Sequence, residues 1–414
     1  MITRPLHAVL LPPGPAGGGR LTESLIAALD GSGPALLPLD PALPRARLGD
    51  LLRAFAPTTI ETLDDSENVS LAAESGLAAA SPGVAPEVAV VLATSGSTGR
   101  PKGAELTAAA LLASARASLA RLAGDDRQPG GRWLAGLPTH HISGLGILVR
   151  SLLAGTEPML VSRIDSAALT AAAEAGCDYA SLVPAQLRRL LDDRAPVGAF
   201  RRILLGGAAI PAAMLAEAAE AGARVVTSYG MTETCGGCVY DGLPLDGVEV
   251  ATGSDGRIRL RGPVLFSGYR LAPDATAAAL GDGWFTTSDL GGRDGEGRLV
   301  IRGRADDVIN SGGEKVVAAE VEDALRSCHS VRDAVVVGTP DPLWGELVTA
   351  LVIPADPALP PTLEGLREQV SSRLPRYAAP RELRLIAEIP MLASGKPDRR
   401  LLRELISPGH ATTA

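Results

Sequence analysis

A glycine-rich segment of ten residues constrains this chain more than any other feature. Residues 94–103 read TSGSTGRPKG and follow an apolar, β-branched run at 88–93 that predicts a buried strand. Glycines let a backbone approach an anion closely, while hydroxyl groups and a lysine add donors and positive charge. The segment therefore predicts a loop that holds the phosphates of a nucleotide. Its candidate ligands are Thr94, Ser95, Gly96, Ser97, Thr98, Gly99 and Lys102.

Two other interpretations of this segment are less well supported. A Walker A loop requires Gly-Lys-Ser/Thr at its end, whereas here Pro101 precedes Lys102 and Gly103 stands in place of the hydroxyl residue. A flexible Gly/Ser linker seldom follows a buried strand.

Length and composition limit the class of protein. A chain of 414 residues with 46% hydrophobic and 21% charged residues predicts two or three folded domains. A net charge of −8 and a pI near 5.3 argue against a nucleic-acid-binding surface. The short apolar run at 8–11 is broken by Pro12-Pro13, and no apolar stretch is long enough to span a bilayer. We expect a cytoplasmic protein.

The cysteines include one CxxC pair, Cys235 and Cys238. A structural zinc site needs a second pair of Cys or His ligands, and Cys328-His329 lies far away in the sequence. We expect Cys235 and Cys238 to be packing residues, with a zinc or redox site as the alternative.

The order of apolar segments predicts the architecture. From residue 94 onward, strand-like and helix-like segments alternate, which is typical of a mostly parallel sheet with helices on both faces. Ligands of such sheets collect at the carboxyl ends of the strands. Short alternating segments at 248–269 predict an antiparallel β unit, and the chain after 302 predicts a small α+β domain. Residues 17–19, three consecutive glycines, predict a surface turn.

Several short motifs fall where these strands end. They are His140-His141, Gly206-Gly207-Ala208, Tyr229-Gly230-Met231-Thr232-Glu233, Thr287-Ser288-Asp289, Arg302 to Asp307, and Ser394-Gly395-Lys396. Together with residues 94–103, and in this order, they resemble the acyl-adenylate-forming superfamily from about residue 88 to about residue 400. This resemblance implies an α/β fold with a large N-terminal domain of parallel and mixed sheets plus a β unit (1–302), a hinge (303–306) and a small mobile α+β C-terminal domain (307–414).

The resemblance also implies a two-step reaction with ATP, Mg²⁺ and coenzyme A. A carboxylate attacks the α-phosphorus of ATP, pyrophosphate leaves, and a thiol then displaces AMP from the acyl-adenylate. Because both steps bring anions together, catalysis rests on positioning and on charge stabilisation.

Roles for individual residues follow from the same resemblance. Residues 94–102 would hold the β- and γ-phosphates, Thr232 the α-phosphate, and Glu233 the Mg²⁺ ion. Lys396 would bridge the attacking carboxylate and the α-phosphate. His141 would line and gate the acyl pocket. Gly206, Gly207 and Ala208 would line the adenine edge and the acyl pocket. Tyr229 would stack on the adenine, and the nucleotide-binding set also includes Ser228, Gly230 and Met231. Asp289 and Arg304 would contact the ribose, Asp306 would be the hinge residue, and Gly312 and Gly313 would face the nucleotide pocket during thioester formation.

Taken singly, some of these residues also have ordinary explanations. Lys396 could be a surface lysine, Glu233 a residue near a helix N-cap, and His141 a packed histidine. His140 occupies a position where relatives often carry an aromatic residue, so its role stays open.

The acid is indicated by two segments and by the short N-terminal part. Residues 137–145 (LPTHHISGL) and 180–187 (ASLVPAQL) resemble the o-succinylbenzoate–CoA ligases of menaquinone synthesis. Arg150 is a candidate partner for the second carboxylate of that acid, with an exposed helical arginine as the alternative. Three further functions stay open: a fatty or aryl acyl-CoA synthetase, an adenylation partner of a carrier protein, and a non-catalytic nucleotide- or acyl-binding module. A homodimer is one assembly that the sequence leaves open.

Overall fold

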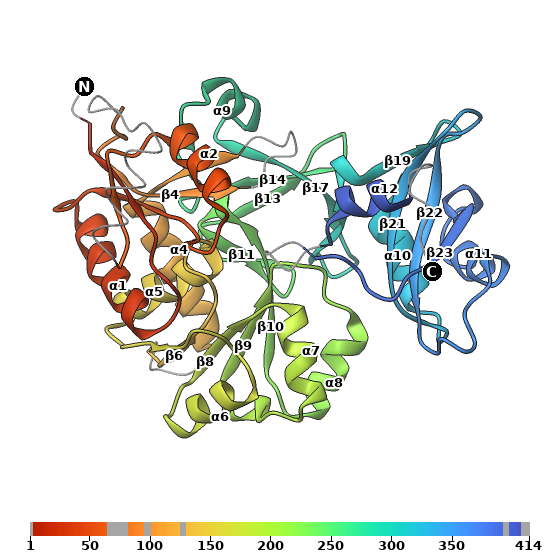
Figure 1. The fold of residues 1–414 in the computed structure, drawn as a ribbon, viewed down its shortest axis with the longest axis horizontal. Helices are drawn as coiled ribbons and strands as arrows, with labels where there is room; N and C mark the ends of the chain where they lie inside the picture. The colour runs from red at the N-terminus through yellow and green to blue at the C-terminus, as the bar shows by residue number, and fades with distance from the viewer. Residues whose placement is uncertain (1–2, 64–81, 95–100, 125–129, 392–396, 407–414) are drawn as a thin grey trace. The chain divides into compact units, whose positions relative to one another are not determined.

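The computed structural model describes residues 3–63, 82–94, 101–124, 130–391 and 397–406. Two compact units emerge from the backbone contacts (Figure 1). The first comprises Met1–Val250 and Leu260–Thr286, and the second comprises Ala251–Arg259 and Thr287–Ala414.

The first unit begins with a six-stranded sheet of order β15-β5-β4-β2-β1-β3. Strands β1 to β4 pair in parallel, whereas β5 is antiparallel to both β4 and β15. Its strands are β1 (Leu6–Val9), β2 (Ala35–Pro38), β3 (Thr59–Glu61), β4 (Val88–Thr94), β5 (Lys102–Thr107) and β15 (Gly268–Tyr269). Helices α1 (Pro15–Asp30) and α2 (Arg45–Phe55) connect the first three strands. The predicted strand at 88–93 is confirmed as β4.

A seven-stranded sheet of order β12-β11-β10-β9-β8-β6-β7 completes the main framework of this unit. Strands β7, β6, β8, β9 and β10 are parallel, so their carboxyl ends meet at one edge. The strands are β6 (Trp133–Ala135), β7 (Met159–Leu160), β8 (Tyr179–Leu182), β9 (Arg202–Gly206), β10 (Val225–Met231), β11 (Gly236–Tyr240) and β12 (Leu243–Pro244). The predicted mostly parallel sheet is confirmed.

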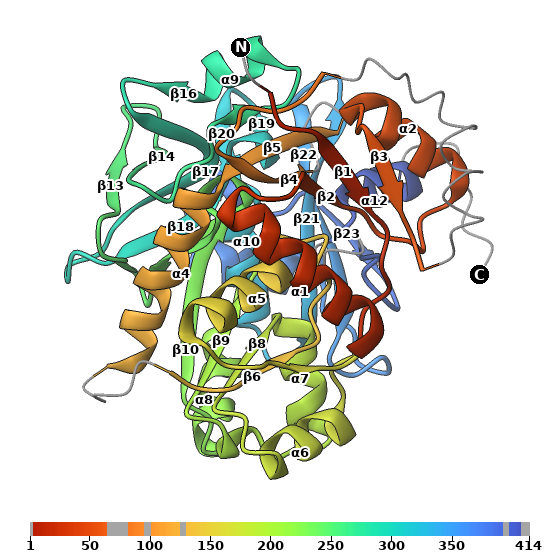
Figure 2. The same cartoon turned by 90° about the vertical axis from the view of Figure 1, so that its left-hand side faces the viewer.

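Helices cover both faces of this sheet (Figure 2). One face packs against α6 (Ser166–Glu174), α7 (Pro184–Asp192) and α8 (Ala212–Glu220) through a buried cluster that includes Leu169, Leu187 and Leu205. Helices α4 (Ala108–Ala123) and α5 (Ile142–Ala154) pack against β6 and β11. Thr107 begins α4 as its N-cap, because its hydroxyl oxygen accepts the N–H of Ala110 at 3.1 Å.

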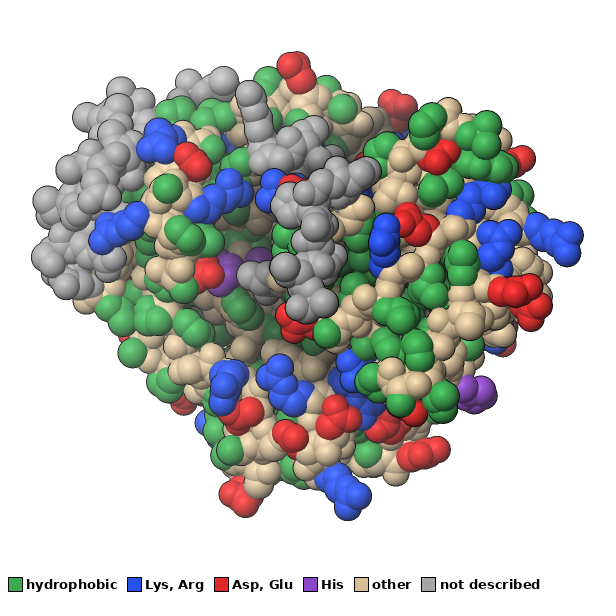
Figure 3. Space-filling model, turned by 45° about the vertical axis from the view of Figure 1, so that its right-hand side comes forward, with side chains coloured by type: hydrophobic (Ala, Val, Ile, Leu, Met, Phe, Trp, Pro, Cys, Tyr) green, Lys and Arg blue, Asp and Glu red, His purple; other side chains and the backbone are tan. Residues whose placement is uncertain are grey.

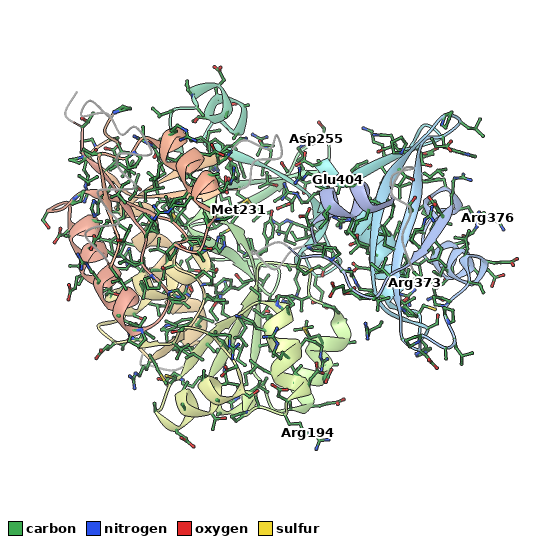
Figure 4. The ribbon with its side chains drawn as sticks, viewed as in Figure 1. Arg194, Met231, Asp255, Arg373, Arg376 and Glu404 are labelled. Carbon is green, nitrogen blue, oxygen red and sulfur yellow. The ribbon has the colours of Figure 1, made fainter. Side chains whose placement is uncertain are left out.

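One sequence prediction in this unit is wrong. Residues 17–19 are not a surface turn but lie within α1, where Gly17 and Gly18 are buried. A side chain at Gly17 would meet the carbonyl oxygen of Pro12 at 2.0 Å, so close packing rather than a turn requires this glycine. Strand β10 extends through Met231 (labelled in Figure 4), and β11 pairs with its second half.

The boundary between the two units falls within a third, five-stranded sheet. Its members are β13 (Glu249–Thr252), β14 (Arg257–Arg261), β16 (Leu280–Gly281), β17 (Trp284–Arg293) and β18 (Leu299–Arg304), and α9 (Pro273–Ala279) precedes β16. Strand β17 is antiparallel to both β16 and β18. The predicted β unit at 248–269 is therefore present, except that Gly268–Tyr269 joins the six-stranded sheet.

The second unit contains a five-stranded sheet of order β20-β19-β22-β21, with β23 also pairing with β22. The strands are β19 (Val308–Ser311), β20 (Glu314–Val317), β21 (Val331–Asp341), β22 (Gly345–Pro354) and β23 (Glu382–Leu385). Helices α10 (Ala318–Arg326) and α11 (Leu363–Ser371) pack in its main core, and Leu402 of α12 (Arg399–Ile406) packs in a second cluster. The predicted α+β region is confirmed, while the hinge at 303–306 lies inside this unit and stays a prediction.

The surface carries charges of both signs. On the face in Figure 3, acidic and basic side chains are interspersed rather than gathered by sign. Within the described ranges, no helix has both the length and the apolar character needed to cross a bilayer.

Candidate active site

Two neighbouring parallel strands bring two of the predicted motifs of the first unit to one edge of the seven-stranded sheet. The 206–208 segment follows β9, and the 229–233 segment ends β10, which lies beside β9 in the sheet. Gly206 pairs with Ser228, and a side chain at Gly206 would meet the carbonyl oxygen of Ser228 at 2.7 Å. Gly207 adopts a φ of 88°, which glycine tolerates best. Two of the predicted nucleotide-binding segments are therefore neighbours.

Strand β10 leads directly into the turn that carries Thr232 and Glu233. This turn is the 3₁₀ helix η2 (Thr232–Thr234), and Thr234 closes it: its hydroxyl oxygen accepts the N–H of Met231 at 2.9 Å and donates to the carbonyl of Gly236 at 2.7 Å. Gly230 lets β11 approach, because a side chain there would meet the carbonyl oxygen of Gly236 at 2.1 Å. The acidic side chain is thus presented from a tightly closed turn.

Glu233 is largely buried, with 9% of its surface exposed. Its Oε1 atom accepts a hydrogen bond of 2.8 Å from the hydroxyl of Tyr269, and its backbone carbonyl accepts the N–H of Phe266 at 2.9 Å. The described residues contain no cluster of three metal ligands. One carboxylate suits Mg²⁺ nonetheless, because this ion is commonly held by one or two carboxylates together with substrate phosphates.

The ends of the predicted phosphate loop are close together. Thr94 ends β4 and pairs with Lys102, which begins β5. Ser95, Gly96, Ser97, Thr98 and Gly99 lie outside the described residues. The Lys102 ammonium group lies 4.9 Å from the centre of the Tyr269 ring. Tyr269 therefore contacts both a residue of the phosphate loop and the candidate metal ligand.

His141 occupies the N-cap position of α5, after the carboxyl end of β6. Its ring lies 4.5 Å from the ring of His140, whose Nε2 atom is 3.9 Å from Oδ2 of Asp40. Burial lowers the pKa of His140, and the nearby Asp40 carboxylate opposes this shift without overcoming it. Asp40, on the loop after β2, was not predicted from the sequence, because no local pattern marks it.

Arg150 lies on α5 and is not the exposed arginine that the sequence allowed as an alternative. Only 8% of its surface is exposed, and its guanidinium carbon lies 4.3 Å from the centre of the Trp133 ring. Among the described residues no carboxylate pairs with it, and its Nε–H has no hydrogen-bond partner. Burial lowers the pKa of this group. Within the described part of the chain, the buried Arg150 cation thus has an aromatic neighbour but no anionic partner.

The second unit holds the ribose and hinge candidates. Arg304 lies opposite Asp289 in the β17–β18 ladder, and its Nη1 atom is 3.4 Å from a carboxylate oxygen of Asp289. Its Nη2 atom is 3.2 Å from Asp306. The N–H of Asp289 donates to the hydroxyl oxygen of Thr287 at 3.0 Å, which fixes the backbone at this point. Lys396 lies outside the described residues.

Gly312 and Gly313 form the two-residue turn between β19 and β20. Their φ angles are 61° and 86°, and a tight hairpin with positive φ at both positions strongly favours glycine. A side chain at Gly312 would meet the Trp344 ring at 2.6 Å. The geometry of this hairpin therefore accounts for both glycines without a ligand.

Cys235 and Cys238 are buried beside the glycine-rich turn. Burial raises the pKa of Cys238 to about 12 and that of Cys235 further. A thiol that stays protonated is neither a reactive nucleophile nor a ready metal ligand. Their burial fits the predicted packing role.

This chain resembles known proteins in sequence. The chain matches the AMP-binding enzyme family over residues 24–270 and the AMP-binding enzyme C-terminal domain over residues 320–396. A probable 2-succinylbenzoate–CoA ligase of Mycobacterium tuberculosis is 44% identical over 329 residues, covering 76% of this chain and 84% of that protein. The indoleacetate–CoA ligase of Aromatoleum aromaticum is 33% identical over 359 residues, covering 79% and 69%. This chain belongs to the AMP-binding enzyme family.

Solved structures agree with this assignment. The o-succinylbenzoate CoA synthetase of Bacillus subtilis, in complex with its acyl-adenylate intermediate, aligns with a TM-score of 0.80 at 29% identity, covering 96% of this chain and 88% of that one. The same enzyme in complex with ATP and a magnesium ion aligns with a TM-score of 0.80 at 28% identity, covering 96% and 89%. The predicted acyl-adenylate-forming fold and the predicted class, an AMP-forming acid–CoA ligase, are confirmed.

Proposed function

We propose that this protein joins o-succinylbenzoate to coenzyme A in two steps. The carboxylate of the succinyl arm attacks the α-phosphorus of ATP, the bond to pyrophosphate breaks, and an acyl-adenylate forms. The deprotonated thiol of coenzyme A then attacks the acyl carbon and AMP leaves. The similarity to o-succinylbenzoate ligases of Mycobacterium and Bacillus supports this choice of acid.

The structural observation that supports a dicarboxylic acid as the substrate is the buried cation of Arg150. A buried charge without a partner is costly, and a dicarboxylate can supply the missing anion. The Nη1 atom of Arg150 lies 3.2 Å from where a side chain at Gly146 would begin, so the guanidinium leans one turn back along α5. About 7 Å of helix separates Gly146 from His141. In this proposal the acid enters beside His141, and its second carboxylate reaches Arg150 farther along α5.

In this proposal each of the remaining candidate residues binds either the nucleotide and its metal ion or the reacting groups. Glu233 would hold Mg²⁺, which would offset charge on the phosphates, while Thr232 and residues 94–102 would bind the phosphates themselves. Asp289 would bind the ribose, with Arg304 held against it. The glycines at 206–207, with Ala208, would leave room for adenine and the acyl group, Tyr229 would stack on adenine, and Lys396 would join the attacking carboxylate to the α-phosphate.

Domain movement is part of the same proposal. Residues 1–302 and 307–414 would act as two domains joined by a hinge at 303–306, with Asp306 as its pivot. The hairpin at Gly312-Gly313 would face the nucleotide during thioester formation. We also keep the cytoplasmic location as a prediction.

The decisive experiment measures pyrophosphate release with ATP, Mg²⁺ and a panel of acids, followed by thioester formation on addition of coenzyme A. The matched acid is 4-oxo-4-phenylbutanoate, which keeps the succinyl arm and lacks the ring carboxylate. We expect o-succinylbenzoate to be preferred by at least about tenfold. Arg150→Met should reduce this preference by lowering activity on o-succinylbenzoate while sparing 4-oxo-4-phenylbutanoate.

Other outcomes would redirect or reject the proposal. Preference for a fatty or simple aromatic acid would keep the reaction and change the substrate. Lys396→Ala should abolish adenylation while ATP still binds. Absence of pyrophosphate release with every acid would instead favour a non-catalytic binding module.

A further inference from the structure

Tyr269 contacts two residues of the candidate site, and no sequence motif marks it. Its hydroxyl donates to Oε1 of Glu233 at 2.8 Å, and its ring lies 4.9 Å from the Lys102 ammonium group. A cation over an aromatic face is attracted to the ring. One side chain therefore links the end of the phosphate loop to the candidate metal ligand.

The segment that carries Tyr269 holds Glu233 at a second point. The N–H of Phe266 donates to the backbone carbonyl of Glu233 at 2.9 Å, and the Phe266 ring meets the Tyr269 ring edge-on with 4.8 Å between centres. Both the backbone and the carboxylate of Glu233 are thus held by residues 266–269. This restrains the side chain to a narrow range of orientations.

Tyr269 is itself fixed by its surroundings. It pairs with Ala104 in the β15–β5 ladder, and its N–H donates to the hydroxyl of Thr276 at 2.8 Å. The next residue, Arg270, is buried and donates to the carbonyls of residues 55, 56, 82 and 83. The phenol therefore has little freedom to leave Glu233.

The hydrogen bond also determines which oxygen of Glu233 is available. A carboxylate oxygen has no hydrogen to donate, so the phenol is the donor in this bond. With Oε1 accepting that proton, Oε2 has no hydrogen-bond partner among the described residues. A carboxylate held in this way offers one free oxygen, which fits a magnesium ion shared with phosphates.

We propose that Tyr269 is a positioning residue that fixes the carboxylate of Glu233 for Mg²⁺ and aligns Lys102 with the same site. This inference deepens the proposed function and rests on its assignment of Glu233 to the metal. Partners of metal ligands commonly change metal affinity by tenfold or more when removed.

The test is the affinity for Mg²⁺ of the full-length protein with a non-hydrolysable ATP analogue, measured by titration calorimetry. Tyr269→Phe keeps the ring and removes the hydroxyl, and should weaken Mg²⁺ binding about tenfold. Tyr240→Phe is the matched control, because Tyr240 is buried and its hydroxyl bonds to Ser118 at 2.7 Å. It should leave Mg²⁺ affinity unchanged. Tyr269→Leu should in addition weaken binding of the analogue itself by about threefold, since the ring beneath Lys102 is lost.

A double-mutant cycle shows whether Tyr269 acts through Glu233. Glu233→Gln should weaken Mg²⁺ binding, and adding Tyr269→Phe to it should weaken binding no further. Wild-type affinity in Tyr269→Phe, or equal effects of Tyr269→Phe with and without Glu233, would overturn the inference. Because no acid is present, the result is independent of whether o-succinylbenzoate is the substrate.

Discussion

The side chain of Arg399 donates to the buried carboxylate of Glu322 at 2.7 Å. Glu322 also accepts the backbone N–H of Val336 at 2.8 Å, while Arg399 donates to the carbonyl of the same residue at 2.6 Å. The Nε atom of Arg399 is 3.3 Å from Asp307, which ends the 3₁₀ turn η3 (Ala305–Asp307). Helix α12 is therefore anchored by charge both to the core of the second unit and to the turn that contains the predicted hinge.

Removing Arg399 should destabilise the second unit. Among the described residues, Arg399→Met leaves buried Glu322 with the more distant Arg326, at 3.6 Å, as its one cationic partner, so we expect a loss of about 3 kcal/mol in the free energy of unfolding. Arg400→Met, in the same helix and exposed, should change it by less than about 0.5 kcal/mol. Urea unfolding followed by circular dichroism measures both. A similar small effect in the two variants would show that the Arg399 pair contributes little.

The first helix offers a contrast between two nearby glycines. Gly19 has open space where a side chain would begin, so Gly19→Ala should stabilise α1 by about 0.5–1 kcal/mol. Gly17→Ala should destabilise the protein, because the added carbon would meet the carbonyl oxygen of Pro12. Thermal unfolding of the two variants should therefore shift in opposite directions. Shifts of the same sign would contradict the packing of α1 against residue 12.

Acid should weaken the fold partly through His140. Because burial lowers its pKa in the folded state, the unfolded chain binds the proton first as the pH falls below the usual value of 6.5. The stability contributed by the neutral ring is therefore present above that value and is lost on acidification. His140→Gln should lose less stability than the wild type between about pH 7.5 and about pH 5.5. Parallel profiles in urea unfolding would exclude this residue as a cause.

The predicted hinge at residue 306 can be tested with two variants, one that restricts the backbone and one that removes only the charged side chain. Asp306→Pro fixes φ near −65°, so it should slow thioester formation about tenfold more than adenylation if residue 306 rotates between the two steps. Asp306→Ala is the control, because it removes the contact with Arg304 and leaves the backbone free. Each half-reaction is measured by pyrophosphate exchange and by thioester yield. Equal losses in both half-reactions for the proline variant would place the hinge elsewhere.

Local patterns predicted the elements well because apolar runs and their ends report burial directly. The strand at 88–93 and the positions of residues 206–208 and 229–233 at the edge of a sheet follow from such patterns. Long-range contacts left no local signal. Tyr269 belongs to a two-residue strand whose partner lies at residue 104, and the buried state of Arg150 depends on Trp133 of another element. The surface turn predicted at residues 17–19 was wrong, because close packing of α1 outweighs the usual preference of glycine for turns.

The late position of Arg270 in the chain has a consequence for synthesis on the ribosome. Its buried guanidinium donates hydrogen bonds to the backbone carbonyls of residues 55, 56, 82 and 83. The preceding residue, Tyr269, belongs to β15, the edge strand of the six-stranded sheet. Domains generally fold as units while the chain emerges from its N-terminus. Strand β5 ends at Thr107 and β15 begins at Gly268, so about 160 residues are translated between them, and this sheet can be completed only after they have been made.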